Sequence, residues 1–278
     1  MTVTVARHAG YCFGVRDAVT IALDAATQYD GVYMLGDVVH NEEVVRKLDD
    51  VGAQVVKNLD DVQDRPILFR AHGTPVEIWE EAKRRNLRII DATCPLVTQI
   101  HHEVEELESE GRQIIIIGDH GHDEVVGIAS HVKAPIVVSK PDEVDGLRKM
   151  RKVGVVSQST QTIENVQAIL ARLLMKGLDI RFINTICFPT KQNQSEVKDL
   201  AVANEVVIIV GSFTSANTKR LAQIAQSLNP RSYQVASHTD LRREWFDGVE
   251  TVGVTAGAST PDHLIEGVVA ALQGMEER

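Results

Sequence analysis

The chain has few cysteines and no long apolar segment, and both shortages narrow its class. Only three cysteines occur among 278 residues, which excludes a disulfide framework and favours a reducing compartment such as the cytosol. The longest apolar runs, IIII at 114–117 and VVIIV at 206–210, are too short to cross a bilayer. The first residues, MTVTVARHAGY, lack the basic start, apolar stretch and cleavage site of a signal peptide. A globular, cytoplasmic protein is therefore expected.

Charge and missing motifs exclude further classes. Acidic residues outnumber Lys and Arg by 39 to 29, and the net charge of −10 disfavours nucleic acid and anionic membranes as partners. No G-x-G-x-x-G occurs, so a bound nicotinamide cofactor is not indicated. No low-complexity segment or long linker interrupts the chain, and its 44% hydrophobic content is enough for a packed core.

Apolar runs of strand length alternate with segments of helical periodicity. The strand candidates are TVTVA, GVYMLG, PILFRA, LRIIDA, QIIIIG, PIVVS, KVGVVS, IRFINT, EVVIIVG and ETVGVTAG. After Cys94, apolar residues from Leu96 to Leu107 recur on one helical face. The alternation predicts an α/β fold in which helices connect neighbouring parallel strands by right-handed crossovers.

An internal repeat is anchored on the cysteines. Twenty-four residues after each cysteine a glycine ends an apolar run, and a polar residue follows four positions later: Gly36 and His40, Gly118 and His122, Gly211 and Ser215. Two positions further on lie Glu42, Glu124 and Asn217, and another strand then ends at His72, at Ser159 with Thr160, and at Ser259. The repeat predicts three α/β units, at 13–94, at 95–187, and at 188–278 together with 1–12.

Each cysteine lies between an apolar run and a helical segment, where ligands collect in α/β sheets. Three units around a pseudo-threefold axis would bring the three thiols together. Sulfur ligands select zinc, copper(I) or iron–sulfur clusters, and structural zinc commonly uses C-x-x-C pairs, which this chain lacks. A cuboidal cluster on three cysteines leaves one iron open to substrate. A zinc site and unrelated buried thiols are the alternatives.

Hydrogen-bond donors dominate the loops that follow the strands. Glycines beside several of them allow close backbone approach, and Pro75 and Pro261 mark helix starts. Together these features predict a pocket for a small anion such as phosphate or diphosphate. The pocket residues are His40, His72, His122, Ser215, Asn217 and Ser259.

Glu124 is the exception in this pocket, because a carboxylate beside a diphosphate is electrostatically unfavourable. It is expected to be protonated or to transfer a proton, and the alternative is an ordinary acid in the first turn of a helix. Glu42, at the same offset in the first repeat, is interpreted as such an ordinary acid, since EEVVRKL resembles a helix start.

Nine motifs occur in order over nearly the whole chain: HAGYCFGV, VVHN, AHG, DATCPLV, GHDEVVG, SQST, NTIC, SANTKRL and GASTP. This set resembles the 4-hydroxy-3-methylbut-2-enyl diphosphate reductase family, which catalyses the last step of the non-mevalonate isoprenoid route. Two segments depart from the family pattern: Ala216 stands where a second serine is common, and SQST replaces a TQTT-like loop.

The resemblance implies three pseudo-symmetric units around a central 4Fe-4S cluster held by Cys12, Cys94 and Cys187. It implies substrate contacts by the six pocket residues and proton delivery by Glu124, helped by the hydroxyl group of Ser159 or Thr160.

The reaction implied is reductive dehydroxylation to isopentenyl and dimethylallyl diphosphate, with ferredoxin or flavodoxin as electron donor. Two other functions would also use such a cluster. A hydro-lyase would need arginines that the motif loops do not offer, and a non-catalytic redox protein would not need the pocket.

Overall fold

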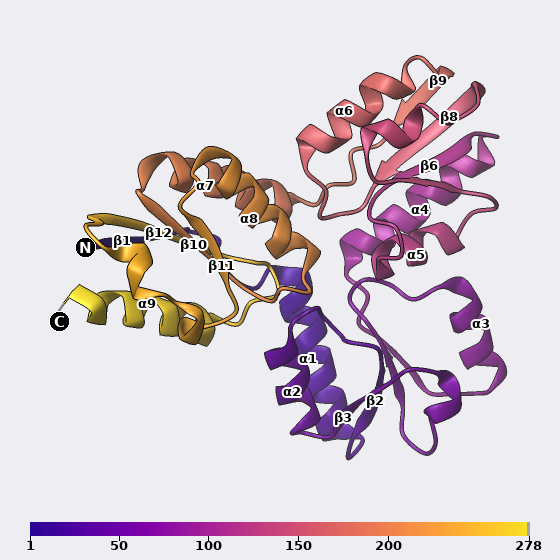
Figure 1. The fold of residues 1–278 in the computed structure, drawn as a ribbon. Coiled ribbons are helices and arrows are strands. Elements are labelled where there is room, and N and C mark those ends of the chain that lie inside the picture. The colour runs from indigo at the N-terminus through magenta and orange to yellow at the C-terminus, as the bar shows by residue number, and fades with distance from the viewer. Residues whose placement is uncertain (277–278) are drawn as a thin grey trace. The chain divides into compact units, whose positions relative to one another are not determined.

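The computed structural model describes residues 1–276 and contains three four-stranded parallel sheets (Figure 1). The first sheet, in the order β3-β2-β4-β5, consists of β2 (Val32–Leu35), β3 (Ala53–Val56), β4 (Ile67–Phe69) and β5 (Ile89–Asp91). The second, in the order β7-β6-β8-β9, consists of β6 (Gln113–Ile117), β7 (Ile136–Val138), β8 (Met150–Ser157) and β9 (Gly177–Phe182). The third, in the order β11-β10-β12-β1, consists of β10 (Val206–Val210), β11 (Ser232–Val235), β12 (Thr251–Ala256) and β1 (Thr2–Val5).

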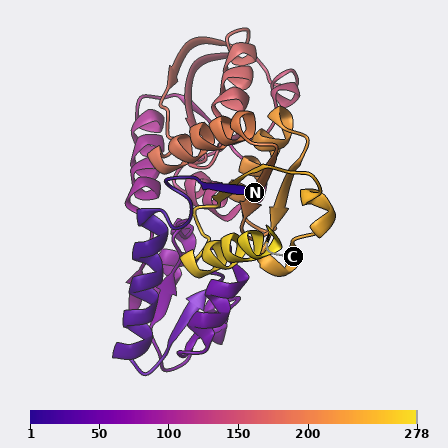
Figure 2. The ribbon, with the colours of Figure 1, turned by 90° about the vertical axis from the view of Figure 1, so that its left-hand side faces the viewer.

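The three sheets have the same topology, except that the N-terminal strand β1 takes the place of β5 and β9 in the third sheet. Figure 2 shows β1 among the C-terminal segments, near α9. The predicted α/β fold with three parallel-sheet units is confirmed. Each sheet takes its strands from one of the predicted ranges 13–94, 95–187 and 188–278 with 1–12, while the limits of these ranges stay a prediction.

Helices connect the strands in a repeating series. A helix follows each cysteine, a second follows the first strand of each unit, and a third connects to the last strand or ends the chain. In chain order they are α1 (Phe13–Gln28), α2 (Glu42–Asp49), α3 (Val76–Arg84), α4 (Pro95–Ser109), α5 (Asp123–Ser130), α6 (Ile163–Leu173), α7 (Phe188–Ala203), α8 (Ala216–Leu228) and α9 (Asp262–Glu276). Among the described residues, none of these helices has the length and apolar character needed to cross a membrane.

Two strands were not predicted, β3 (AQVV) and β11 (SYQV). Both are edge strands, and each carries a glutamine in a run of only four residues. An edge strand is half exposed, so its sequence needs no continuous apolar run. In β3 and β11 the glutamine interrupts a short apolar run, so these two strands were missed while the other edge strands, β1, β5, β7 and β9, were predicted.

The chain also divides into two compact units, which differ from the three α/β units described above. One contains Met1–Arg16, His40–Val44 and the chain from Phe188 onward, and it includes the sheet built on β10 and β12. The other contains Asp17–Val39 and Val45–Cys187, and it includes the first two sheets.

The core of the second sheet shows why its central strand β6 is apolar at four successive positions, 114–117. Ile114 and Ile116 of β6 pack with residues of α4 and α5, whereas Ile115 and Ile117 pack with residues of α6. Successive strand residues point to opposite faces, so helices on both faces bury the entire strand. In the third sheet, Val207 and Ile209 pack likewise with α7 and α8, and the alternate residues pack with α9.

This burial predicts that Ile116→Ala lowers the free energy of unfolding by about 2–5 kcal/mol, because it leaves a cavity where the side chain is fully buried. Urea unfolding checks the value. Val126→Ala on α5 is the control, since Val126 is 45% exposed and its truncation should change the free energy by about 0.5 kcal/mol or less. Equal losses in the two variants would contradict the assigned core.

Candidate functional site

The three cysteines occupy equivalent positions. Each follows the fourth strand of its sheet and directly precedes a long helix. Each backbone N–H donates to a carbonyl two residues beyond the end of the third strand: Cys12 to Ala258 at 3.2 Å, Cys94 to Ala71 at 3.0 Å and Cys187 to Ser159 at 3.0 Å. All three cysteines are half-buried. The predicted repeat is therefore present in the hydrogen bonds as well as in the sequence.

The loop after each third strand makes an equivalent turn. The N–H of the turn's last residue donates to the carbonyl three residues earlier: Gly73 to Arg70, Gln161 to Gln158 and Thr260 to Gly257. The residue before the last is one of the predicted set: His72, Thr160 or Ser259. At Gly257 a Cβ atom would lie 2.0 Å from Oγ1 of Thr218, so only glycine fits there.

The second polar position of each repeat lies at the start of a helix. His122 is the N-cap of α5, and its Nδ1 accepts from the Glu124 N–H at 3.2 Å. Ser215 is the N-cap of α8, and its Oγ accepts from the Thr218 N–H at 3.3 Å. At α2 the side chain of Asn41 accepts hydrogen bonds from the N–H groups of Glu43 and Val44 instead. His40 therefore lies one residue before the capping residue. The Ser259 hydroxyl group donates to the carbonyl of His40 at 3.2 Å.

In the unit that contains the first two sheets, several predicted residues come together. The rings of His72 and His122 lie edge to face, with centroids 5.8 Å apart. An ion pair of 2.7 Å between Arg70 and Asp123 joins the loops that carry these two histidines. The polar residues that follow β4 and β6 therefore lie side by side, although the two strands belong to different sheets.

Glu124 is almost fully buried, with 1% of its surface exposed. One carboxyl oxygen accepts from the backbone N–H of Ser159 at 2.5 Å, and the other accepts from the Ser159 hydroxyl group at 2.8 Å. A buried carboxyl group without such partners would be strongly destabilising. The sequence left open whether Ser159 or Thr160 assists Glu124, and the structure places the Ser159 hydroxyl in direct contact with it.

Asn217, in the first turn of α8, is 6% exposed, and its Nδ2 atom has no hydrogen-bond partner among the residues that the structure describes. Buried polar atoms are normally paired, so an orphaned donor indicates a missing acceptor. A helix N-terminus already favours negative charge. The combination fits an anionic ligand at the start of α8.

Glu42 is more than an acid at a helix start. One of its carboxyl oxygens accepts from the hydroxyl groups of Ser212 and Thr214, at 2.9 and 3.1 Å, in the loop that leads to Ser215. Burial acts to raise the pKa of Glu42. The hydrogen bonds from Ser212, from the backbone of Glu42 itself and from Thr214 act in the opposite direction and are stronger together, so the pKa is lowered. No pattern in the sequence indicates these hydrogen bonds, because both partners lie 170 or more positions away from Glu42.

The cysteines that the sequence predicts as metal ligands are distributed over both units. Cys12 belongs to the unit with the third sheet, and Cys94 and Cys187 belong to the other. Within the described part of the chain, no three His, Cys, Asp or Glu side chains lie close enough together to form a metal site.

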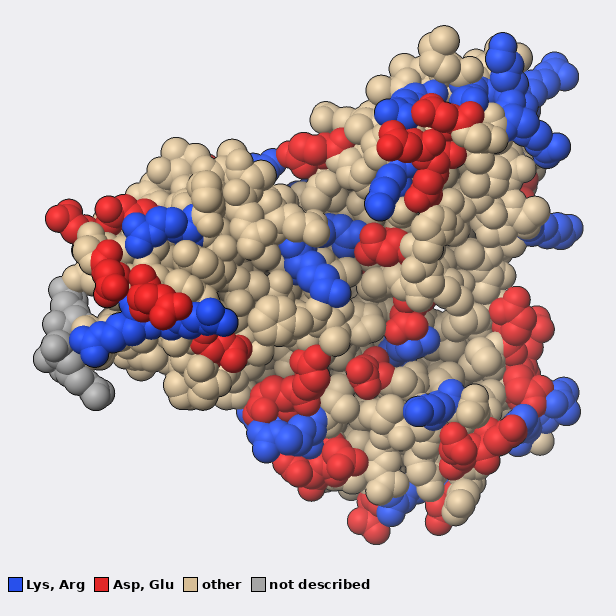
Figure 3. All heavy atoms as spheres, in the orientation of Figure 1, with Lys and Arg blue, Asp and Glu red and all other residues tan. Residues whose placement is uncertain are grey.

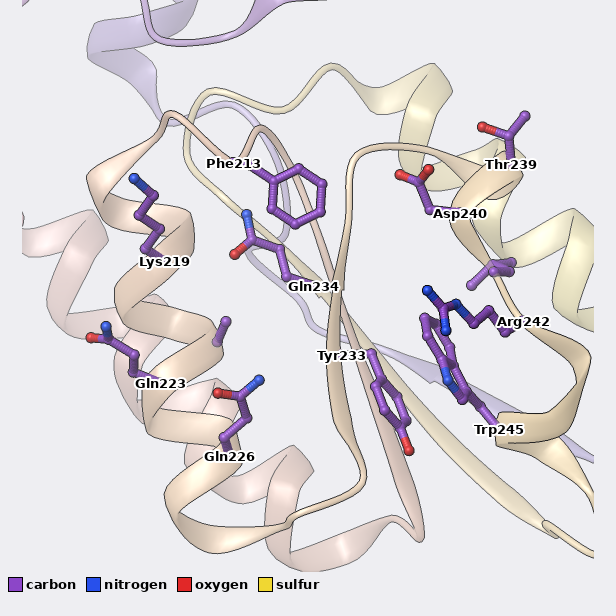
Figure 4. Close-up of a pocket in the computed structure, with 12 residues that line it drawn as sticks. Phe213, Lys219, Gln223, Gln226, Tyr233, Gln234, Thr239, Asp240, Arg242 and Trp245 are labelled. Atoms are coloured by element: carbon purple, nitrogen blue, oxygen red, sulfur yellow. The ribbon is translucent and has the colours of Figure 1, made fainter.

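Two cavities lie in the unit with the third sheet. One, of about 350 Å³, adjoins Cys12 and is lined also by Arg7, Arg16 and Asn193. The other, of about 720 Å³, contains none of the predicted site residues. Figure 4 shows it between Lys219 and the glutamines of α8 on one side and Trp245 on the other, where Trp245 stacks on Tyr233 at 4.0 Å.

Three like α/β units, each with a cysteine and a polar strand-end loop, define a class of α/β proteins with a threefold internal repeat. The family model described as LytB protein matches residues 3–273, and the chain belongs to this family.

Curated relatives carry the name 4-hydroxy-3-methylbut-2-enyl diphosphate reductase. The protein of Geobacter metallireducens is 40% identical over 99% of this chain and 98% of its own length. That of Geotalea uraniireducens is 42% identical over 98% of this chain and 97% of its own.

Two solved structures are similar over nearly the whole chain. One is (E)-4-hydroxy-3-methyl-but-2-enyl diphosphate reductase, described as the terminal enzyme of the non-mevalonate pathway. It is 36% identical, covers 99% of this chain and 100% of its own, and has a TM-score of 0.73. The other is the E-1-hydroxy-2-methyl-but-2-enyl-4-diphosphate reductase from Plasmodium falciparum, 29% identical, with a TM-score of 0.94 over 98% of this chain and 87% of its own.

The ring of His101 packs against Gly73, which follows His72 in the chain. The contact is so close that a Cβ atom on Gly73 would lie 2.8 Å from this ring. His101 is 7% exposed and stacks on His131 with centroids 4.1 Å apart. Burial, with a smaller contribution from the charge of His131, lowers the pKa of His101 to about 4 from 6.5. The imidazole is therefore neutral in the folded protein at ordinary pH.

This lowered pKa predicts a loss of stability in acid. Between pH 6.5 and 4 the unfolded chain binds a proton on His101 and the folded chain does not, so stability falls as the pH falls. The loss attributable to this group should reach about 3 kcal/mol at pH 4. Urea unfolding across this range should show a weaker pH dependence in His101→Gln than in His102→Gln, whose ring is 74% exposed. Equal pH dependence in the two variants would contradict the assignment.

Proposed function

We propose that this chain catalyses the reductive dehydroxylation of 4-hydroxy-3-methylbut-2-enyl diphosphate. The substrate takes up two electrons and two protons, its allylic C–O bond breaks, and water leaves with isopentenyl or dimethylallyl diphosphate as the product. Membership of the LytB family, and relatives that carry this reductase name over their full length, support the proposal. They favour it over a hydro-lyase and over a non-catalytic redox protein.

The threefold equivalence of the cysteines is the observation that carries the proposal. Each thiol stands at the start of a helix, where the helix dipole favours the thiolate form that binds metals. We propose that Cys12, Cys94 and Cys187 hold a 4Fe-4S cluster. A set of three thiolates fits such a cluster, whereas structural zinc normally takes four protein ligands. When bound, the cluster supplies the electrons singly and Lewis acidity for the departing hydroxyl group.

The hydrogen-bond donors would hold the diphosphate group. Because Nδ1 of His122 accepts a hydrogen bond, its neutral ring carries the proton on Nε2 and can donate to a phosphate oxygen. The orphaned amide of Asn217 and the hydroxyl group of Ser215 offer donors at the start of α8. We propose that these residues, with His40, His72 and Ser259, form the substrate pocket.

Glu124 would supply a proton through Ser159. When the carboxyl group is protonated, the 2.8 Å hydrogen bond reverses, and Glu124 donates to the Ser159 oxygen. The serine hydroxyl is then free to donate to the departing oxygen of the substrate, so a proton can move along the pair as water forms. Thr160, at the next position of the same turn, is the other hydroxyl group proposed to take part.

An external carrier must deliver the electrons, and we propose a ferredoxin or a flavodoxin for this role. We place the reaction in the cytoplasm, because cluster-binding thiols need a reducing compartment.

The cluster predicts a defined loss in three variants. Cys12→Ser, Cys94→Ser and Cys187→Ser should each lose most of the bound iron and sulfide and most of the activity, because each thiolate is one of only three ligands. Anaerobic purification with iron and sulfide analysis checks this, followed by assay with the diphosphate substrate and a chemical reductant. Circular dichroism should show that the variants still fold. One tightly bound zinc without sulfide in the unaltered protein would overturn the cluster and favour a zinc site.

The proposed roles also predict a separation of chemistry from binding. Glu124→Gln keeps the side chain's size but removes the acid, so kcat should fall by about 10²–10⁴-fold while the cluster remains. Asn217→Ala should mainly raise KM, because a phosphate contact acts in the ground state and the transition state alike. Steady-state kinetics over a range of substrate concentrations up to saturation give both kcat and KM. A near-normal kcat in Glu124→Gln would indicate that Glu124 has a purely structural role.

A further inference from the structure

A surface at the amino ends of β8 and β9 combines strong positive charge with exposed apolar side chains. Four cations lie within five consecutive residues, Arg148, Lys149, Arg151 and Lys152, and all are exposed. The apolar members are Leu174, Met175 and Leu178, which are 69%, 77% and 88% exposed. We call these seven residues the basic edge patch.

The two segments of the basic edge patch lie side by side. Met150 pairs with Gly177 and Lys152 with Asp179 in the parallel register of β8 and β9. The N–H of Met150 donates to the carbonyl of Lys176 at 2.7 Å, which holds the segments together where the strands begin. Figure 3 shows Lys and Arg side chains gathered over this end of the sheet, around the labels of β8 and β9 in Figure 1.

The four cations of the patch make no ion pair within the described chain. Acidic side chains do lie near this end of the sheet, but other cations hold them. Asp142 and Asp145 pair with Arg172, Asp179 pairs with Arg112, and Glu110 pairs with Arg112 and Arg181. The patch therefore carries about four uncompensated positive charges on a chain whose net charge is −10.

The patch lies apart from the proposed reaction. It is at the amino ends of β8 and β9, whereas Ser159 and Cys187 follow their carboxyl ends. Side chains so exposed add little to folding, and large exposed apolar residues that are clustered mark interaction surfaces. The patch is thus available for a partner.

We propose that the basic edge patch docks this protein on an anionic membrane surface. Lysine and arginine are attracted to acidic phospholipid headgroups, while leucine and methionine insert at the boundary of the acyl chains. A fluid lipid layer accommodates projecting side chains without needing a matching depression. A second copy of this chain would oppose four cations with four cations, which is repulsive.

The net negative charge does not prevent this contact. Charges further than about 8 Å from the membrane surface are largely screened at physiological ionic strength. The membrane therefore responds to the positive charge of the patch and not to the net charge of the whole chain. Binding would be peripheral and reversible, because three inserted side chains bury little apolar area.

Sedimentation with lipid vesicles tests the proposal on the full chain carrying its iron and sulfide. The protein is expected to bind vesicles of equal parts phosphatidylcholine and phosphatidylserine, not vesicles of phosphatidylcholine alone, and salt should release it. R148Q/K149Q/R151Q/K152Q should weaken the partition constant by about 100-fold or more, since each cation contributes roughly 5-fold, or about 1 kcal/mol. L174S/M175S/L178S should weaken it roughly 10-fold.

Matched controls separate the patch from general charge and hydrophobicity. K57Q/K83Q/K133Q/K140Q changes the net charge equally at exposed lysines elsewhere, and V202S/L228S removes other exposed apolar side chains. Both control proteins should bind as the unaltered protein does, and all variants should keep their far-ultraviolet circular dichroism.

Absence of binding to the anionic vesicles at low salt would overturn the proposal, as would equal binding by the patch and control variants. If patch substitutions weakened binding to poly-glutamate but not to vesicles, the surface would belong to an acidic protein partner and the membrane assignment would be wrong. None of these outcomes depends on turnover, so the docking surface and the proposed reaction can fail separately.

Discussion

One backbone hydrogen bond, repeated three times, underlies the arrangement of the site residues. The N–H of each cysteine donates to a carbonyl just beyond the third strand, so the chain leaving the fourth strand is tied to the loop leaving the third. This bond holds each thiol at the carboxyl edge of its sheet, where the following helix begins. It also fixes the turn that presents His72, Thr160 or Ser259, so the cysteine and the polar loop of each unit are positioned together.

Parallel strands give these loops their direction. Since every strand of a sheet runs the same way, all strand ends and all helix starts lie at one edge. Residues far apart in the sequence then become neighbours, as Glu124 and Ser159 do across 35 positions. The helix starts also explain the cap contacts of His122 and Ser215, whose side chains accept hydrogen bonds from the N–H groups of Glu124 and Thr218.

The third unit closes on the N-terminus of the chain. Strand β1 pairs with β12 and supplies the position that β5 and β9 hold in the other sheets. Cys12 therefore follows a strand of the third sheet while it precedes the helix of the first repeat. The bond from Ser259 to His40, and those from Ser212 and Thr214 to Glu42, likewise join the end of the chain to its beginning.

Much of this could be predicted from the amino-acid sequence. Continuous apolar runs such as IIII marked strands buried on both faces, and the offsets from the cysteines revealed the threefold repeat, because equivalent positions carry the same local geometry. Edge strands β3 and β11 were missed, since a glutamine interrupts each of these four-residue strands. The limits of the three units and the roles of the site residues stay predictions.

Contacts between distant segments were decided only by the tertiary structure. Three examples depend on strand register and loop packing: the contact of Glu124 with Ser159, the hydrogen bonds from the loop before α8 to Glu42, and the joining of two exposed segments into the basic edge patch. A sequence pattern records which residues share an element and a face. It does not record which elements approach one another, because that is set by how the sheets pair and bury their apolar faces.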